Sequence, residues 1–142
     1  MTLTHWAREV RIGISILSVA AIGCTTAFAA GGDFPFDSEL LFDARPMKGS
    51  KQVPSMDIGP RGQASIRLWC NTVTGQLVVV ADTVTILTGQ KTERQCPAER
   101  MRGDDDMLSA LTRVTNWRRD GSLVQFEGAE VDKPLRFHLP TN

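Results

Sequence analysis

Two cysteines, Cys70 and Cys96, constrain this chain more than any other feature of its sequence. The third cysteine, Cys24, lies in an N-terminal region with the character of a targeting signal. The clearest strand and turn patterns lie between Cys70 and Cys96, and a helical pattern follows Cys96. This cysteine pair therefore indicates the type of domain, although the sequence does not say what molecule the domain acts on.

The N-terminus has the features of a secretory signal peptide. Arg8 and Arg11 precede an apolar run over residues 12–23, and an Ala-x-Ala cleavage site ends at Ala29. The run is shorter than the roughly 20 residues that a membrane-spanning helix needs. We therefore expect residues 1–29 to be removed as a signal peptide, no transmembrane span to remain, and the mature protein to be periplasmic or secreted.

A lipid anchor is the alternative fate of this region. Ala-Ile-Gly before Cys24 resembles a lipobox, with alanine where leucine is more common. Lipidation at Cys24 would tether the domain to a membrane.

In an oxidising compartment disulfides persist, and the mature chain offers a single pairing, Cys70 with Cys96. Such a bond would close a loop of about 26 residues and stabilise the fold by about 3.5 kcal/mol. Two free buried thiols are the other possibility for this pair.

Length and charge narrow the class of protein. A chain of 142 residues accommodates one ordinary domain, and its 42% hydrophobic and 23% charged residues suit a folded core. Removing residues 1–29 leaves 14 basic and 15 acidic residues. A nearly neutral domain gives no electrostatic argument for binding nucleic acid or an anionic membrane surface.

The mature chain divides into residues 30–62, rich in Gly and Pro and expected to be irregular with one short strand, and a core over residues 63–142. In the core, Ala64, Ile66 and Leu68 alternate with Ser65, Arg67 and Trp69, as in a half-buried strand. Strands are expected at residues 39–42, 64–70, 76–80, 83–87, 115–118, 122–126 and 135–139, with a turn over 71–75.

A helix is expected between these strands, because Met107, Leu108, Leu111 and Val114 recur at helical spacing. The acidic run over residues 104–106 is suited to its N-cap and first turn. The helix could instead begin near Ala98, which would place Gly103 inside it at a cost of up to about 1 kcal/mol relative to Ala.

These elements predict an α+β fold that is mostly β. Short connections between consecutive strands favour antiparallel pairing. We expect a strongly curved antiparallel sheet or partly closed barrel, with one helix inserted between the strand meander and the C-terminal hairpin.

A Cys-Asn-x-x-x-Gly sequence is followed by Thr-x-x-x-Cys, with apolar residues in the helix and in the last strand. The motif residues are Cys70, Asn71, Gly75, Thr92 and Cys96, and the apolar residues are Leu108, Leu111, Leu135 and Phe137. The order of these features resembles the META domain family, also called HslJ-like. The resemblance implies a small bacterial envelope or secreted protein, often a lipoprotein, without an established catalytic activity.

Catalytic, cofactor and metal sites are not expected. A cysteine nucleophile needs a nearby base, and His138, the one histidine of the mature chain, is predicted to point outward from the last strand. The consecutive residues Asp104, Asp105 and Asp106 lack the spaced ligands and glycine turn of a calcium loop. Helix capping accounts for them without a metal.

A recognition face is the remaining candidate site. Two indoles and three guanidinium groups would line it if the strands that carry them are neighbours. Its residues are Arg67, Trp69, Trp117, Arg118 and Arg119. The alternative is that Trp69 packs under the N-terminal segment and Trp117 against the helix, because large aromatic side chains are usually buried.

The function expected from these observations is that of a monomeric, non-enzymatic module that binds an unknown protein or envelope component, or supports the envelope under stress. The alternative is a small barrel-like carrier or a protease inhibitor. A carrier would require a sizeable apolar cavity.

Overall fold

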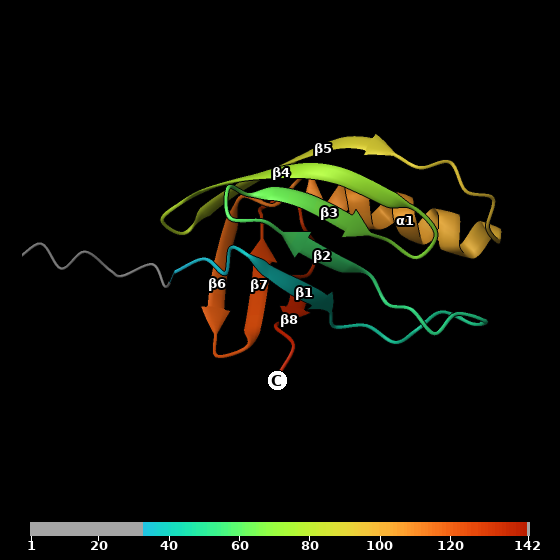
Figure 1. Ribbon diagram of the computed structural model, residues 1–142, viewed down its shortest axis with the longest axis horizontal. Coiled ribbons are helices and arrows are strands. Elements are labelled where there is room, and N and C mark those ends of the chain that lie inside the picture. Colours follow the sequence, from blue (N-terminus) through green and yellow to red (C-terminus); the bar gives the residue numbers. More distant parts are fainter. Residues whose placement is uncertain (1–32, 142) are drawn as a thin grey trace, which may run out of the picture.

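The computed structural model describes residues 33–141, which form a closed barrel of eight antiparallel strands with one helix (Figure 1). The predicted signal peptide and Cys24 lie outside the described residues. Each strand pairs with the next along the chain, and β1 pairs with β8 through Leu41 with His138 and Phe42 with Phe137. The elements are β1 (Ser38–Phe42), β2 (Ser55–Ile58), β3 (Gln63–Arg67), β4 (Thr72–Val80), β5 (Thr83–Lys91), α1 (Ala98–Leu111), β6 (Asn116–Asp120), β7 (Leu123–Glu127) and β8 (Leu135–His138).

The mostly β fold with one inserted helix is confirmed, and closure of the barrel is complete rather than partial. Apolar side chains on the inner faces of the strands fill the interior as one cluster, as the period-2 alternation predicts. The most deeply buried of them include Leu40, Met56, Leu77, Val124, Phe126 and Phe137.

The irregular N-terminal segment contains two strands rather than the one expected. β2, which pairs with both β1 and β3, was missed because Pro54 and Pro60 bracket its four residues. The carbonyl of Pro54 still takes part in the β1–β2 pairing, because it accepts a hydrogen bond from the N–H of Phe42 at 2.9 Å. A strand this short leaves little room for alternation between the prolines.

The turn expected over residues 71–75 is also wrong, because β4 begins at Thr72. The chain reverses earlier, where the N–H of Leu68 donates to the carbonyl of Asn71 at 2.8 Å. β3 ends at Arg67, before the reversal. The alternation predicted for residues 64–70 therefore stops short of Trp69.

One end of the molecule is covered by α1 and by the segments that approach it (Figure 1). The helix begins at Ala98, so the later of the two predicted starts is wrong. It buries Asp104, Met107 and Leu111. These positions follow the helical spacing i, i+3 and i+7, so they lie on one face of α1.

Aromatic side chains occupy the other end. Phe34 lies 4.9 Å from Trp117 and 6.3 Å from Phe126 between ring centroids. The indole Nε1 of Trp117 donates to the carbonyl of Ala81 at 2.8 Å, and its backbone N–H donates to the carbonyl of Asp82 at 2.9 Å. Trp117 thereby ties β6 to the β4–β5 turn, where β5 and β6 share a single residue pair.

Candidate functional site

Cys70 and Cys96 form a disulfide, with their Cα atoms 6.1 Å apart, as the sequence predicts. The bond joins the reversal before β4 to the connection between β5 and α1. Both β4 and β5 therefore lie inside the covalent loop. The signature cluster is the group of residues around this bond, namely Cys70, Asn71, Thr92, Cys96 and Asp104.

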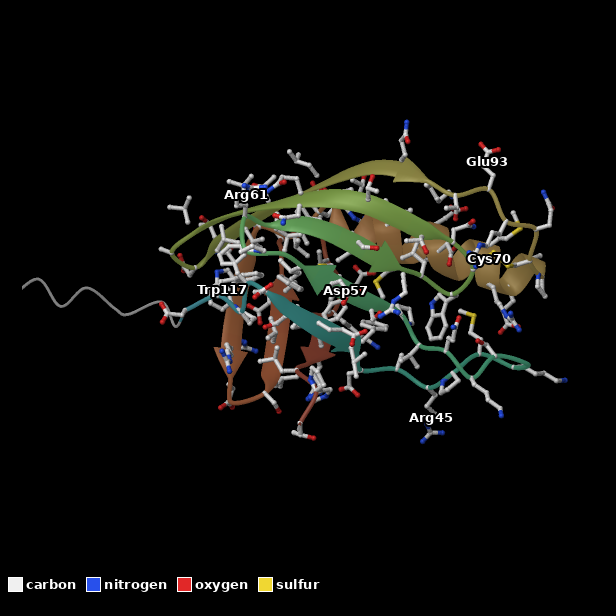
Figure 2. The ribbon with its side chains drawn as sticks, in the orientation of Figure 1. Arg45, Asp57, Arg61, Cys70, Glu93 and Trp117 are labelled. Carbon is white, nitrogen blue, oxygen red and sulfur yellow. A yellow bond between two sulfur atoms is a disulfide. The ribbon has the colours of Figure 1, made fainter. Side chains whose placement is uncertain are left out.

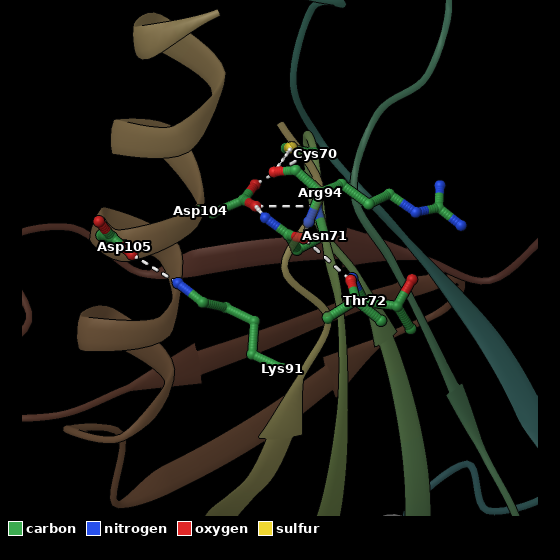
Figure 3. Close-up of polar contacts among 8 residues, drawn as sticks. Cys70, Asn71, Thr72, Lys91, Arg94, Asp104 and Asp105 are labelled. Carbon is green, nitrogen blue, oxygen red and sulfur yellow. Dashed lines mark hydrogen bonds and ion pairs between the residues drawn. The ribbon is translucent and has the colours of Figure 1, made fainter. Parts of the chain in front are cut away.

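Asp104 is the centre of the signature cluster (Figure 3). Its carboxylate is fully buried and accepts hydrogen bonds from the backbone N–H groups of Cys70, at 3.0 Å, and Asn71, at 2.8 Å. The side-chain amide of Asn71 donates to the same carboxylate at 3.1 Å. A buried carboxylate is stabilised by several N–H donors in this way, so Asp104 fixes the reversal before β4 to the helix.

The predicted helix-capping role of the acidic run is therefore wrong. Asp104 lies in the second turn of α1 and caps the Cys70–Asn71 reversal instead of its own helix. Asp105 forms an ion pair with Lys91 of β5 at 3.0 Å, and Asp106 is exposed. Within residues 33–141 no group of three or more His, Cys, Asp or Glu side chains could hold a metal ion.

Asn71 links the helix to the segment that follows β5. Its Oδ1 accepts hydrogen bonds from the hydroxyl of Thr92, at 2.9 Å, and the backbone N–H of Arg94, at 2.8 Å. The Thr92 hydroxyl also accepts a bond from the N–H of Thr72 at 3.0 Å. The side chain of Asn71 therefore joins three separate parts of the chain, where the sequence suggested only a local turn.

Gly75, the last motif residue, lies inside β4 and forms no turn. It faces Thr88, next to a register shift in the β4–β5 pairing. A Cβ at this position would lie 3.1 Å from the carbonyl oxygen of Leu87. The glycine is needed for close approach of the backbones and not for a chain reversal.

The structure does not assemble the expected recognition face. Trp69 is buried, and Trp117 and Cys70, the neighbour of Trp69, lie at opposite ends of the molecule (Figure 2). Trp69 packs beside Gly103 of α1 and Met47 of the N-terminal segment. The two indoles therefore contribute to two separate packed regions.

The arginines of that proposed face are also dispersed. Arg67 pairs with Glu39 and lies 3.5 Å from Asp57. Arg118 pairs with Glu127 at 3.0 Å, and Arg119 donates to the carbonyl of Gly121 at 2.7 Å. Each of the three guanidinium groups therefore contacts residues of its own neighbourhood. The five residues of the expected recognition face do not form one shared surface.

The chemistry that this arrangement offers is structural. Both cysteines are bonded to each other, and the Asp104 carboxylate has three donors around it. His138 lies on β8, and its Nε2 is 3.6 Å from Oδ2 of Asp43. The signature cluster thus fixes the helix, the reversal and the post-β5 segment to one another.

Sequence reasoning missed the role of Asp104, although a cue was present. Asp104 precedes Met107, Leu108 and Leu111 by three, four and seven residues, so it belongs to the inward face of the helix. A carboxylate on a buried face requires N–H donors from elsewhere in the chain. The Cys-Asn reversal provides them.

Within the described residues no helix has the length and apolarity needed to cross a membrane.

The fold is similar to an NMR structure of a protein from Burkholderia xenovorans, with a TM-score of 0.62 and 17% identity, over 75% of this chain and 84% of the other. It is also similar to a second protein solved by NMR, with a TM-score of 0.57 and 16% identity, over 72% and 89% of the two chains. A crystal structure of a DUF4847 family protein from Bacteroides vulgatus matches with a TM-score of 0.50 and 13% identity, over 60% and 57%.

These identities demonstrate a shared fold and no more. No curated protein matches the sequence closely. The META domain matches residues 37–139, which include every strand, the helix and the whole signature cluster. The chain belongs to the META domain family.

Proposed function

We propose that this protein is a monomeric, non-enzymatic META module of the periplasm or the extracellular medium, which binds an envelope component or supports the envelope under stress. The observation that carries the proposal is the Cys70–Cys96 disulfide. Structural disulfides persist in oxidising compartments and are rare in the cytosol. The signal-like N-terminus, with its cleavage site at Ala29, points to the same compartment.

A non-enzymatic role is supported by the two cysteines and by the Asp104 carboxylate, all of which are already engaged within the domain. The disulfide leaves neither cysteine of the described domain as a thiolate nucleophile. The buried carboxylate of Asp104 is engaged by N–H donors of Cys70 and Asn71 and is closed off from substrate.

The carrier alternative receives no support from the barrel. Its interior is occupied by side chains such as Leu40, Phe126 and Phe137, which are 0–2% exposed. The rings of Phe126 and Phe137 lie 5.6 Å apart, in edge contact. A barrel of eight strands is wide enough either to be filled by its own side chains or to hold one small ligand, and in this barrel side chains fill the interior.

Expression of the full chain in an exporting bacterial host tests the compartment. We expect recovery in the osmotic-shock fluid, a mature N-terminus at Ala30, and a Cys70–Cys96 peptide pair under non-reducing conditions. The matched control is Cys24→Ala, which removes the lipidation site and leaves the cleavage site at Ala29 intact. This variant should be processed like the wild type. A diacylglyceryl modification at Cys24, or alkylation of Cys70 and Cys96 in the native protein, would contradict the proposal.

A further inference from the structure

Charge is unevenly distributed between the two ends of the molecule. The basic end, defined as residues 44–53 and 93–102, contains six Lys and Arg side chains and two carboxylates, for a net charge of +4. The rest of residues 33–141 contains eight cations and thirteen carboxylates, for a net charge of −5. The near-neutral total therefore conceals an excess of positive charge in these two segments. The cations of the basic end are Arg45, Lys48, Lys51, Arg94, Arg100 and Arg102.

The two segments of the basic end are held together. The guanidinium Nη2 of Arg100 donates to the carbonyl of Gly49 at 2.6 Å. Met47 packs at Gly103, one helical turn further along α1. In Figure 1 the loop after β1 and the beginning of α1 project at the same end of the molecule. The loop therefore adds its cations to those at the start of α1.

The cations of the basic end lack ion-pair partners within the part of the chain that the structure describes. None of the six forms an ion pair with another described residue, whereas half of the eight cations elsewhere do. The cations paired elsewhere are Arg67, Lys91, Arg118 and Arg136. Lys48, Lys51 and Arg102 are exposed and donate no side-chain hydrogen bond within residues 33–141. Their charge is thus available to an external anion.

Exposed apolar atoms lie among the cations. Met101 is 39% exposed and sits between Arg100 and Arg102 on α1, and Pro46 of the loop is exposed as well. A projecting end that mixes cations with apolar side chains fits a broad anionic surface with an apolar layer beneath it. Basic clusters of four to eight residues bind bilayers of this kind.

We propose that the basic end docks the protein onto an anionic phospholipid bilayer. The choice of a bilayer as the partner rests on the proposed function, because the envelope membranes present anionic surfaces in the proposed compartment. Lys48, Lys51 and Arg102 contact phosphate headgroups, and Met101 reaches toward the acyl region.

Vesicle flotation of the processed protein, purified from the exporting host, tests this docking. We expect binding to vesicles with 30 mol% phosphatidylglycerol and none to pure phosphatidylcholine. Each cation near an anionic membrane contributes about fivefold to the partition coefficient, so Lys48→Gln/Lys51→Gln/Arg102→Gln should lower it roughly 100-fold. The control Arg61→Gln/Arg119→Gln/Lys133→Gln removes the same charge from exposed cations outside the basic end. It should change binding less than about fivefold.

Equal losses in the two triple variants would show that net charge alone drives binding, and would overturn the proposal. Absence of binding to anionic vesicles in the wild type would do the same. Tighter binding to polyglutamate or to duplex DNA than to the vesicles, at one salt concentration, would replace the bilayer with a different polyanion. Because export and disulfide formation are scored separately, failure of docking is distinguishable from failure of the proposed compartment.

Discussion

The two ends of this molecule are closed by different physical means. At one end the signature cluster joins three chain segments through a disulfide and a buried carboxylate with three N–H donors. At the other end Phe34 and Trp117 pack edge to face, with one indole hydrogen bond to a turn carbonyl. The first arrangement is directional, and the second depends mainly on buried apolar area.

This difference predicts different tolerance to substitution. A buried hydrogen-bonded group cannot be removed without leaving its partners unsatisfied. Aromatic packing can adjust when a ring is replaced by a smaller ring. We therefore expect steep losses at the signature cluster and gradual losses at the aromatic end.

The largest effect is expected for Asp104→Ala. The variant leaves two backbone N–H groups and the Asn71 amide without an acceptor, at about 1–3 kcal/mol for each buried donor. We expect the free energy of unfolding of the oxidised protein to fall by about 4 kcal/mol in urea titrations. The control Asp106→Ala removes an exposed carboxylate from the same helix and should cost less than about 0.5 kcal/mol. Equal losses in these variants would show that the cluster has no special role.

Removal of the disulfide is expected to be the next largest perturbation. Cys70→Ala/Cys96→Ala releases a loop of 26 residues, which predicts a loss of about 3.5 kcal/mol. Because the chain-entropy mechanism acts on the unfolded state, this loss should appear in the global free energy of unfolding measured by urea titration. Local opening next to the removed bond should add to it, so hydrogen exchange should accelerate more at the amide of Arg94 than at the amide of Trp117. Equal acceleration at these two amides would contradict the separation between the two ends.

Gly103→Ala distinguishes local helix propensity from packing. Propensity alone predicts stabilisation by up to about 1 kcal/mol. The added Cβ would lie 2.5 Å from Cε of Met47 and 2.7 Å from Cδ1 of Trp69, so the indole must move. We expect a net loss of about 2 kcal/mol in thermal unfolding. Ser109→Ala, at an exposed position of α1, is the propensity control and should stabilise slightly. A more stable Gly103→Ala variant would refute the packing argument.

The smallest effect is expected for Trp117→Phe at the aromatic end. The variant loses the indole hydrogen bond to Ala81, keeps a ring against Phe34, and retains the backbone bond to Asp82. Since Ala81 is exposed, water can replace the indole donor. We expect a loss of about 1 kcal/mol in urea unfolding. A loss as large as that of Asp104→Ala would show that the aromatic end depends on hydrogen bonds as much as the signature cluster does.

Much of the architecture was predictable because it depends on local periodicity. Alternation located most strands, and helical spacing located α1. The predicted signal peptide, together with the two cysteines that follow it, predicted the disulfide. The predicted alternation failed at Trp69, because β3 ends at Arg67 and the chain reverses before the indole. A pattern of period 2 carries no information about the residue at which pairing stops.

The signature cluster was less predictable, because its contacts join residues distant in sequence. Asp104 binds groups 33 and 34 residues away, so no local pattern identifies its donors. Capping propensity suggested a role at the helix start, and tertiary contacts overrode it. Asn71 and Gly75 resembled turn residues for the same reason, yet they serve a side-chain network and a close backbone approach.

The position of the disulfide also determines how the chain could be divided. Cys70 and Cys96 flank the β4–β5 hairpin, whose exposed tip is Ala81–Asp82. A single peptide-bond break at this tip would yield two polypeptides that remain covalently joined under oxidising conditions and lose that covalent link on reduction. A two-chain form made in this way keeps all eight strands in one cross-linked molecule.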